Sequence, residues 1–239
     1  MPPFHSVSSA WYLVPWLRYL LAGGLLLAVS ILTLPPVLYA DAMPDTSQVL
    51  YAEKDAESLR SLLNTVDADT HRTRNLLYRY RLYPLTEDAS ILDDLPRDLE
   101  DASAKELALL SGLWAYRAGE SSAFNAIRYG RRSLNLLDKA KEKDPIDPFV
   151  LLVEGQSLLY RPSIAGSNPH MAADRFQQLR VVLETQDEAA ISKEEAMIWQ
   201  WVALNEADNG PEAEALHQEL AAADLPPLYQ QFLESPPRV

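Results

Sequence analysis

The chain has 239 residues, of which 48% are hydrophobic, and this suits one domain of moderate size or a short solenoid. Its formal net charge is −13, which argues against non-specific nucleic-acid binding because such binding needs a basic surface. The chain has no Cys, which excludes disulfides, thiolate catalysis and zinc–thiolate sites. Only 8 Gly stand among abundant Ala, Leu, Glu and Arg, so the composition favours helix.

Residues 1–42 form a targeting or anchoring segment. Arg18 is followed by an apolar run over 19–34 and then by small residues at Ala40 and Ala42, an order typical of a secretory signal peptide. The apolar stretch 11–16 leaves an uncleaved membrane anchor open as well. Because Arg18 precedes the apolar run, we expect the rest of the chain outside the cytoplasm, in the periplasm or a similar compartment. Membrane contact is expected only through residues 1–42, if they are uncleaved.

Residues 43–103 are expected to form a helical hairpin and an acidic connector. The first helix is predicted over 48–66, and the second, rich in arginine, is predicted to end before Pro84. The acidic connector 86–101 is expected to hold a short helix before Pro96. Its carboxylates are the expected partners of the arginines, although concentrated arginine in an acidic chain can also bind an anionic or acidic-peptide ligand.

Residues 104–234 are predicted to form further helical hairpins. Their helices are expected over 104–119, from 121 or 122 to 143, over 148–160, from 169 onward, and over 188–208, 211–223 and 228–233. Asn209-Gly210 and Pro211 supply a helix end followed by a helix start. We expect the tail 235–239 to be disordered.

The last hairpin has a more specific pattern. Trp199 is followed by the large–small pair Val202-Ala203, the turn residue Gly210, the small residues Ala215 and Ala222, and Pro227. This spacing resembles the tetratricopeptide repeat (TPR), a helix–turn–helix unit of about 34 residues. The segments with Ala108, Gly112 and Gly119, and with Ala172 and Phe176, resemble it too. The resemblance implies an all-α, TPR-like solenoid whose concave face holds a protein or peptide partner.

The sequence predicts no enzyme, and no catalytic residue, cofactor or metal site, because it carries no phosphate-binding loop, nucleophile elbow or His-Glu-x-x-His motif. The leading hypothesis is an exported, non-catalytic scaffold. The alternative is a transporter-associated module with an enclosed cavity for a small ligand, since the loop 161–169 resembles one in exported TPR-like partners of tripartite substrate-binding transporters. The candidate concave-face or loop binding residues are Tyr116, Trp201, Arg79, Arg81, Arg128, Tyr160, Arg161 and Asn168.

Overall fold

A computed structural model describes residues 46–186 and 190–237, so the expected signal or anchor segment 1–42 lies outside the described residues. The described residues are all-α and belong to one compact unit, residues 45–239. The elements, in chain order, are α3 (Ser47–Ala52), α4 (Ala56–Thr65), α5 (Arg72–Thr86), the 3-10 turn η1 (Ala89–Leu92), α6 (Ala104–Gly119), α7 (Ala123–Lys143), α8 (Pro148–Tyr160), the 3-10 turn η2 (Ser163–Ala165), α9 (Pro169–Leu183), α10 (Lys193–Glu206), α11 (Gly210–Ala221) and α12 (Pro227–Glu234).

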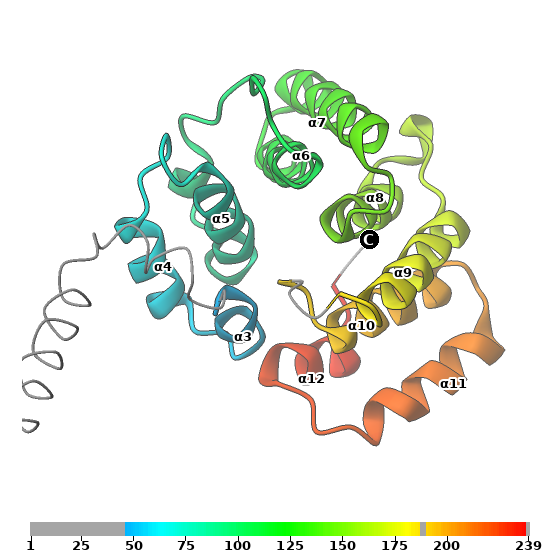
Figure 1. The fold of residues 1–239 in the computed structure, drawn as a ribbon. Helices are drawn as coiled ribbons and strands as arrows, with labels where there is room; N and C mark the ends of the chain where they lie inside the picture. Colours follow the sequence, from blue (N-terminus) through cyan, green and yellow to red (C-terminus); the bar gives the residue numbers. More distant parts are fainter. Residues whose placement is uncertain (1–45, 187–189, 238–239) are drawn as a thin grey trace, which may run out of the picture. The chain divides into compact units, whose positions relative to one another are not determined.

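The helices pack as sequential antiparallel pairs (Figure 1). Helix α4 pairs with α5, α6 with α7, α8 with α9, and α10 with α11, while α6 also packs on α5 and α8, and α10 on α9. The stacked pairs share one continuous core made largely of leucine, alanine and aromatic side chains. The predicted all-α fold of stacked helix pairs is therefore confirmed.

Polar side chains define where several of these helices begin. The Ser103 hydroxyl accepts a hydrogen bond from the Glu106 backbone, and the Glu106 carboxylate accepts one from the Ser103 backbone, which together form a capping box. The side chains of Asp147, Asn168 and Ser192 cap α8, α9 and α10 by accepting hydrogen bonds from backbone N–H groups in the first turn. These caps explain why the starts of α6, α8 and α9 agree with the sequence prediction.

The first predicted hairpin differs in two places. Lys54 has a positive φ of 60°, and the Asp55 side chain caps a new helix, so 48–66 is split into α3 and α4. Helix α5 does not stop before Pro84; it runs to Thr86 and ends at Glu87 in the left-handed conformation. Pro84 is tolerated because it lies in the last turn, where its missing N–H removes a single helical hydrogen bond.

Two glycines allow neighbouring helices to approach closely. A Cβ added at Gly112 of α6 would lie 2.5 Å from the Tyr80 ring of α5, and one added at Gly155 of α8 would lie 2.5 Å from the Phe176 ring of α9. Ala108 and Ala172 are fully buried. Small residues therefore stand where helices meet, as the sequence predicts for these pairs.

The prediction that Ala215 and Ala222 form the packed face of α11 is wrong. Ala215 and Ala222 are exposed, and the buried positions are Ala213, Leu216 and Leu220. The larger leucines at a three-to-four-residue spacing bury more apolar surface than alanines would, and they decide which face turns inward.

The two ends of this unit meet. Helix α12 packs against both α10 and α3 (Figure 1), Phe232 contacts the Trp199 ring, and Lys54 donates to Gln231 over 2.6 Å. The last helix therefore joins the end of the stack to its beginning, in addition to covering α10.

Candidate functional site

The candidate residues Arg81 and Trp201 lie in the interior. Arg81 of α5 is 1% exposed and pairs with the equally buried Glu195 of α10; its second terminal nitrogen donates to Glu195 Oε2 and to the Ala190 carbonyl, each over 2.8 Å. Trp201 is 7% exposed and its ring lies 5.6 Å from that of His217. Both side chains are therefore engaged in contacts within the chain.

Tyr116 and Arg79 are half-buried and also make internal contacts. The Tyr116 ring stacks on Tyr80 and on Tyr83, with centroid separations of 5.5 and 4.7 Å, and burial raises its pKa well above the usual range. Arg79 donates to the backbone carbonyl of Asp93 over 2.9 Å.

The candidates at the loop after α8 are separate from this interior group. Tyr160 is 41% exposed and its ring meets that of Trp199 edge-on. The Asn168 side chain caps α9, its backbone N–H donates to the Leu158 carbonyl, and Arg161 ends α8. The loop is thus tied to both flanking helices, and Ile164 at its tip is 98% exposed.

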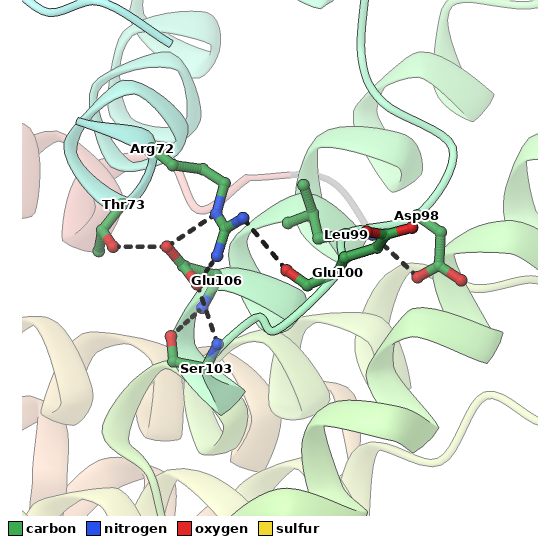
Figure 2. Close-up of polar contacts among 7 residues, drawn as sticks. All are labelled: Arg72, Thr73, Asp98, Leu99, Glu100, Ser103 and Glu106. Atoms are coloured by element: carbon green, nitrogen blue, oxygen red, sulfur yellow. Dashed lines mark hydrogen bonds and ion pairs between the residues drawn. The ribbon is translucent and has the colours of Figure 1, made fainter. Parts of the chain in front are cut away.

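The arginine-rich helix α5 contacts the acidic segment that follows it, but Arg72 and Arg79 reach that segment through the backbone carbonyls of Glu100 and Asp93. The carboxylates that pair with Arg72 and Arg81 are instead those of Glu106 and Glu195, which lie outside the segment. Figure 2 shows Glu106 receiving hydrogen bonds from Arg72, Thr73 and the Ser103 backbone, while Arg72 also donates to the Glu100 carbonyl. Burial alone would raise the pKa of Glu106, but the hydrogen bonds from Arg72, Ser103 and Thr73 outweigh it and lower this pKa to about 2. These hydrogen bonds hold α5 against the start of α6, so the groups that make them have a structural role.

The remaining candidate, Arg128, lies in a cleft between α7 and the connector 93–99. This cleft has a volume of about 550 Å³, and a smaller one of about 190 Å³ adjoins it and shares Arg97, Arg128 and Arg132 with it. We call the two together the α7 cleft. Its lining residues are Asp94, Leu95, Arg97, Asp98, Trp114, Arg117, Phe124, Ile127, Arg128, Tyr129, Arg131, Arg132, Asn135, Leu136 and Lys139.

Helix geometry brings the α7 side chains of this cleft to one face. Positions 124, 127, 128, 131, 132, 135 and 139 recur at intervals of three and four, and such residues lie along one side of a helix. The opposite side of α7 carries the buried Ser133, Leu137 and Ala140. The cleft is therefore the outer surface of a helix whose inner surface is already packed on α6.

The charge of this cleft is opposite to that of the chain. Six cationic side chains and two carboxylates line it, whereas the chain as a whole has a formal net charge of −13. A cleft lined by charge of one sign raises the local concentration of ions of the opposite sign, so this cleft favours an anionic group.

Several of the cationic groups are held in place by aromatic rings. The Arg132 guanidinium lies 4.6 Å from the centre of the Trp114 ring, and that of Arg128 lies 4.8 Å from the Tyr129 ring and donates to its hydroxyl over 3.0 Å. This hydrogen bond from Arg128, aided by Arg117, lowers the Tyr129 pKa. Lys139 pairs with Asp98 across the cleft.

Two arginines of the cleft keep their charge unpaired. Neither Arg97 nor Arg131 makes a hydrogen bond or an ion pair with any other described residue, and both are exposed. Beside them, Phe124 is 81% exposed and Ile127 is 59% exposed. The cleft therefore offers guanidinium groups and apolar side chains to the same ligand.

Arg97, Phe124, Ile127 and Lys139 are among the members of this site that the sequence prediction missed. It named Arg128 among the concave-face or loop candidates together with Arg79 and Arg81 of α5, which do not line this cleft. The signal that identifies the cleft is the alternation of apolar and basic residues at helical spacing along 124–139.

Within residues 46–186 and 190–237, no group of three or more His, Asp or Glu side chains could hold a metal ion. No helix in the same residues is both long enough and apolar enough to span a bilayer. In comparisons with known proteins, no family model matches the chain, and neither a curated protein nor a solved structure is detectably similar to it.

Proposed function

We propose that this chain is an exported, non-catalytic scaffold of the TPR-like kind, and that it binds a protein partner through the α7 cleft. The single observation that carries the proposal is the combination, in that cleft, of unpaired arginines with the exposed side chains of Phe124 and Ile127. Aromatic residues and arginine are the side chains most enriched at protein interfaces.

The TPR-like assignment is supported by helix crossings. Gly112 and Gly155 stand where α5 meets α6 and α8 meets α9, at distances that admit no Cβ without displacement of a ring. Ala203 of α10 is fully buried in the same manner. The exposed Ala215 and Ala222 depart from the repeat, and so does the packing of α12 on α3.

The choice of the α7 cleft over a concave inner face follows from how the inner residues are used. Arg81, Trp201 and Tyr116 make ion pairs or ring contacts within the chain. A partner that used these side chains would have to break those contacts first. A partner that used Arg131 and Phe124 would break no such contacts, which favours the outer surface of α7 as the binding site.

Export is proposed from the order of charge, apolar run and small residues in 1–42 alone, which lie outside the described residues. Mass spectrometry of the mature N-terminus tests it. A new N-terminus after Ala40 or Ala42 supports a cleaved signal, whereas a chain that retains Met1 and stays in the membrane supports the anchor.

The second candidate function is the capture of a small anionic solute. The volume of the cleft, about 550 Å³, lies in the range of small-molecule sites, which is roughly 300–1,000 Å³. Titration with citrate and with inorganic phosphate tests this alternative. Saturable stabilisation by either one at micromolar concentration, absent in Arg131→Gln, would favour it over a protein partner.

Site-specific photo-crosslinking in the producing cell tests the proposal itself. Benzoylphenylalanine replaces one of three residues: Phe124 in the cleft, Tyr160 at the end of α8 before the loop 161–169, or Val181, an apolar residue of α9 that is 60% exposed and outside the cleft. We expect a discrete protein adduct from position 124 and none from 181. An adduct from position 160 alone would indicate that the partner binds near the loop 161–169 and not at the α7 cleft.

A further inference from the structure

We infer that the α7 cleft binds an acidic linear segment of its partner, with apolar side chains of that segment seated on Phe124 and Ile127. This inference rests on the proposed function and adds the chemical class of the partner to it. Four features of the cleft lead to this class: its unpaired charge, its length, the position of its apolar end, and the placement of its carboxylates.

The unpaired charge selects an anion. Arg97 and Arg131 come from opposite walls, the connector and α7, and neither makes a hydrogen bond or ion pair with another described residue. A guanidinium recognises a carboxylate through two parallel hydrogen bonds, and such charge-assisted bonds are about twice as strong as neutral ones. A carboxylate-bearing ligand therefore gains two partners without displacing any internal pair.

The length of the cleft selects an elongated ligand. The lining residues of α7 run from Phe124 to Lys139, which at 1.5 Å per residue is about 22 Å. This length matches about seven residues of extended peptide or about four turns of helix. A compact anion such as citrate would reach only one or two of the cations.

The apolar side chains lie together at one end. Phe124 and Ile127 are three residues apart in the first turns of α7, and both are largely exposed. Single exposed apolar residues are ordinary, but two on one helix face beside arginines match a ligand that is amphipathic. The charged stretch of the ligand then lies along Arg128 and Arg131.

The placement of carboxylates argues against a membrane surface as the ligand. Asp94 and Asp98 stand in the same walls as the arginines, where they would repel anionic headgroups. Arg132 is half-buried against Trp114, inside the cleft. A peptide enters a hollow and can avoid two carboxylates, whereas a flat bilayer contacts only what protrudes.

The binding experiment uses the full chain and a panel of labelled peptides of about fifteen residues, which is long enough to cover the cleft either as a helix or as an extended chain. Each peptide is rich in Asp and Glu and carries two Leu or Phe residues whose separation varies across the panel. Each has a twin in which Asn and Gln replace the acids. We expect at least one acidic peptide to bind, its amide twin to bind about tenfold more weakly or not at all, and the affinity to fall with added salt.

Matched variants locate the binding. Arg128→Gln with Arg131→Gln should weaken the acidic peptide about tenfold. Lys143→Gln with Lys193→Gln removes the same charge from exposed positions outside the cleft and should change little. Phe124→Ser with Ile127→Ser should also weaken binding while every charge is kept. Circular dichroism and thermal melting confirm that all variants fold.

Three results would overturn the inference. The first is that no acidic peptide binds better than its twin. The second is equal weakening by the two charge-removing pairs. The third is that the chain binds vesicles of phosphatidylglycerol and phosphatidylcholine in equal parts, that this binding depends on Arg128 and Arg131, and that peptide binding does not depend on them. This result would make the cleft a lipid-binding surface. A crosslink from position 124 to a protein would keep the proposed function in all three cases.

Discussion

Arg81 and Glu195 form an ion pair that is closed to water and joins helices far apart in the chain. Each is 1% exposed, and Arg81 also lies 4.5 Å from the centre of the Tyr51 ring. Removing one member of such a pair leaves an uncompensated buried charge, which typically costs about 3–5 kcal/mol. Removing one member of this pair should therefore cost more stability than removing one member of an exposed pair.

Arg81→Met should thus lower the free energy of unfolding by about 3–5 kcal/mol, measured by urea denaturation. The double variant Arg81→Met with Glu195→Leu should lose less, because no charge is then left unpaired. Arg60→Met, which breaks the exposed pair with Asp88, should cost less than about 1 kcal/mol. Equal losses for Arg81→Met and Arg60→Met would contradict this account.

Glu106 links stability to pH. Its pKa of about 2 lies below the usual 4.5, so its stabilising effect is complete above about pH 4.5 and is lost as the pH falls toward 2. Glu106→Gln should cost about 2 kcal/mol near neutral pH, since it removes charged hydrogen bonds from Arg72. The difference between the variant and the natural chain should shrink as the pH falls through this window.

Urea denaturation at neutral pH and at several values below pH 4.5 measures this difference. Glu100→Gln is the control, because Arg72 meets Glu100 through its backbone carbonyl and the side chain is exposed; it should cost within about 0.5 kcal/mol. A Glu106→Gln difference that stays constant with pH would show that the carboxylate charge is not the cause.

At the scale of the element, substitution of three helical glycines by alanine distinguishes the effect of close packing on stability from the effect of helix propensity. Gly112→Ala and Gly155→Ala each place a methyl group 2.5 Å from a buried ring, and overpacking of this kind costs about 1–3 kcal/mol. Gly130→Ala in α7 meets nothing within 4 Å and should stabilise by up to about 1 kcal/mol, because Ala favours helix over Gly.

Thermal unfolding of the three variants checks the prediction. Opposite signs for Gly130→Ala and for the other two are expected, and a stabilising Gly112→Ala or Gly155→Ala would show that the rings move aside freely.

The helices that the sequence predicted best are those with strong local signals. The boundaries of α6 and α8 follow from Ser103, Asp147 and Pro148, whose capping is a local property. The split between α3 and α4 depends on one left-handed residue, Lys54, which has no distinctive sequence signal. The inward face of α11 follows the spacing of Ala213, Leu216 and Leu220, and the prediction missed it because it gave weight to the repeat-like alanines Ala215 and Ala222.

At the scale of the whole unit, residues 45–239 are joined at both ends. The pair Arg81–Glu195 and the packing of α12 on α3 and α10 connect the first helices to the last. In an open solenoid each repeat contacts only its neighbours, and terminal repeats can unfold alone. Contacts between the ends couple the terminal helices to the rest.

We therefore expect α3, α12 and α10 to open in one cooperative step. Native-state hydrogen exchange should give their most protected amides the same opening free energy. The variant Phe232→Ala, which removes the ring packed on Trp199, should lower protection in α3 as well as in α12. Loss of protection in α12 alone would show independent ends.

The candidate site could be predicted only in part for the same tertiary reason. Arg128 was selected for its charge, but the connector that brings Arg97 opposite it lies about thirty residues earlier in the chain. Arg81 and Trp201 were selected as binding groups from residue type, because a sequence does not show that Glu195 and His217 will meet them. Charge and spacing indicate what a side chain can do, and packing decides whether it is available.

Hydrogen exchange of the full chain, with and without the acidic peptide that binds most tightly, tests the location of the binding surface most directly. The account predicts slower exchange in the α7 segment 123–143 and in the connector 93–99, with α5, α8 and α10 unchanged. Slower exchange confined to α5, α8 and α10, with α7 unaffected, would place the ligand on the inner side of the helix stack and contradict it.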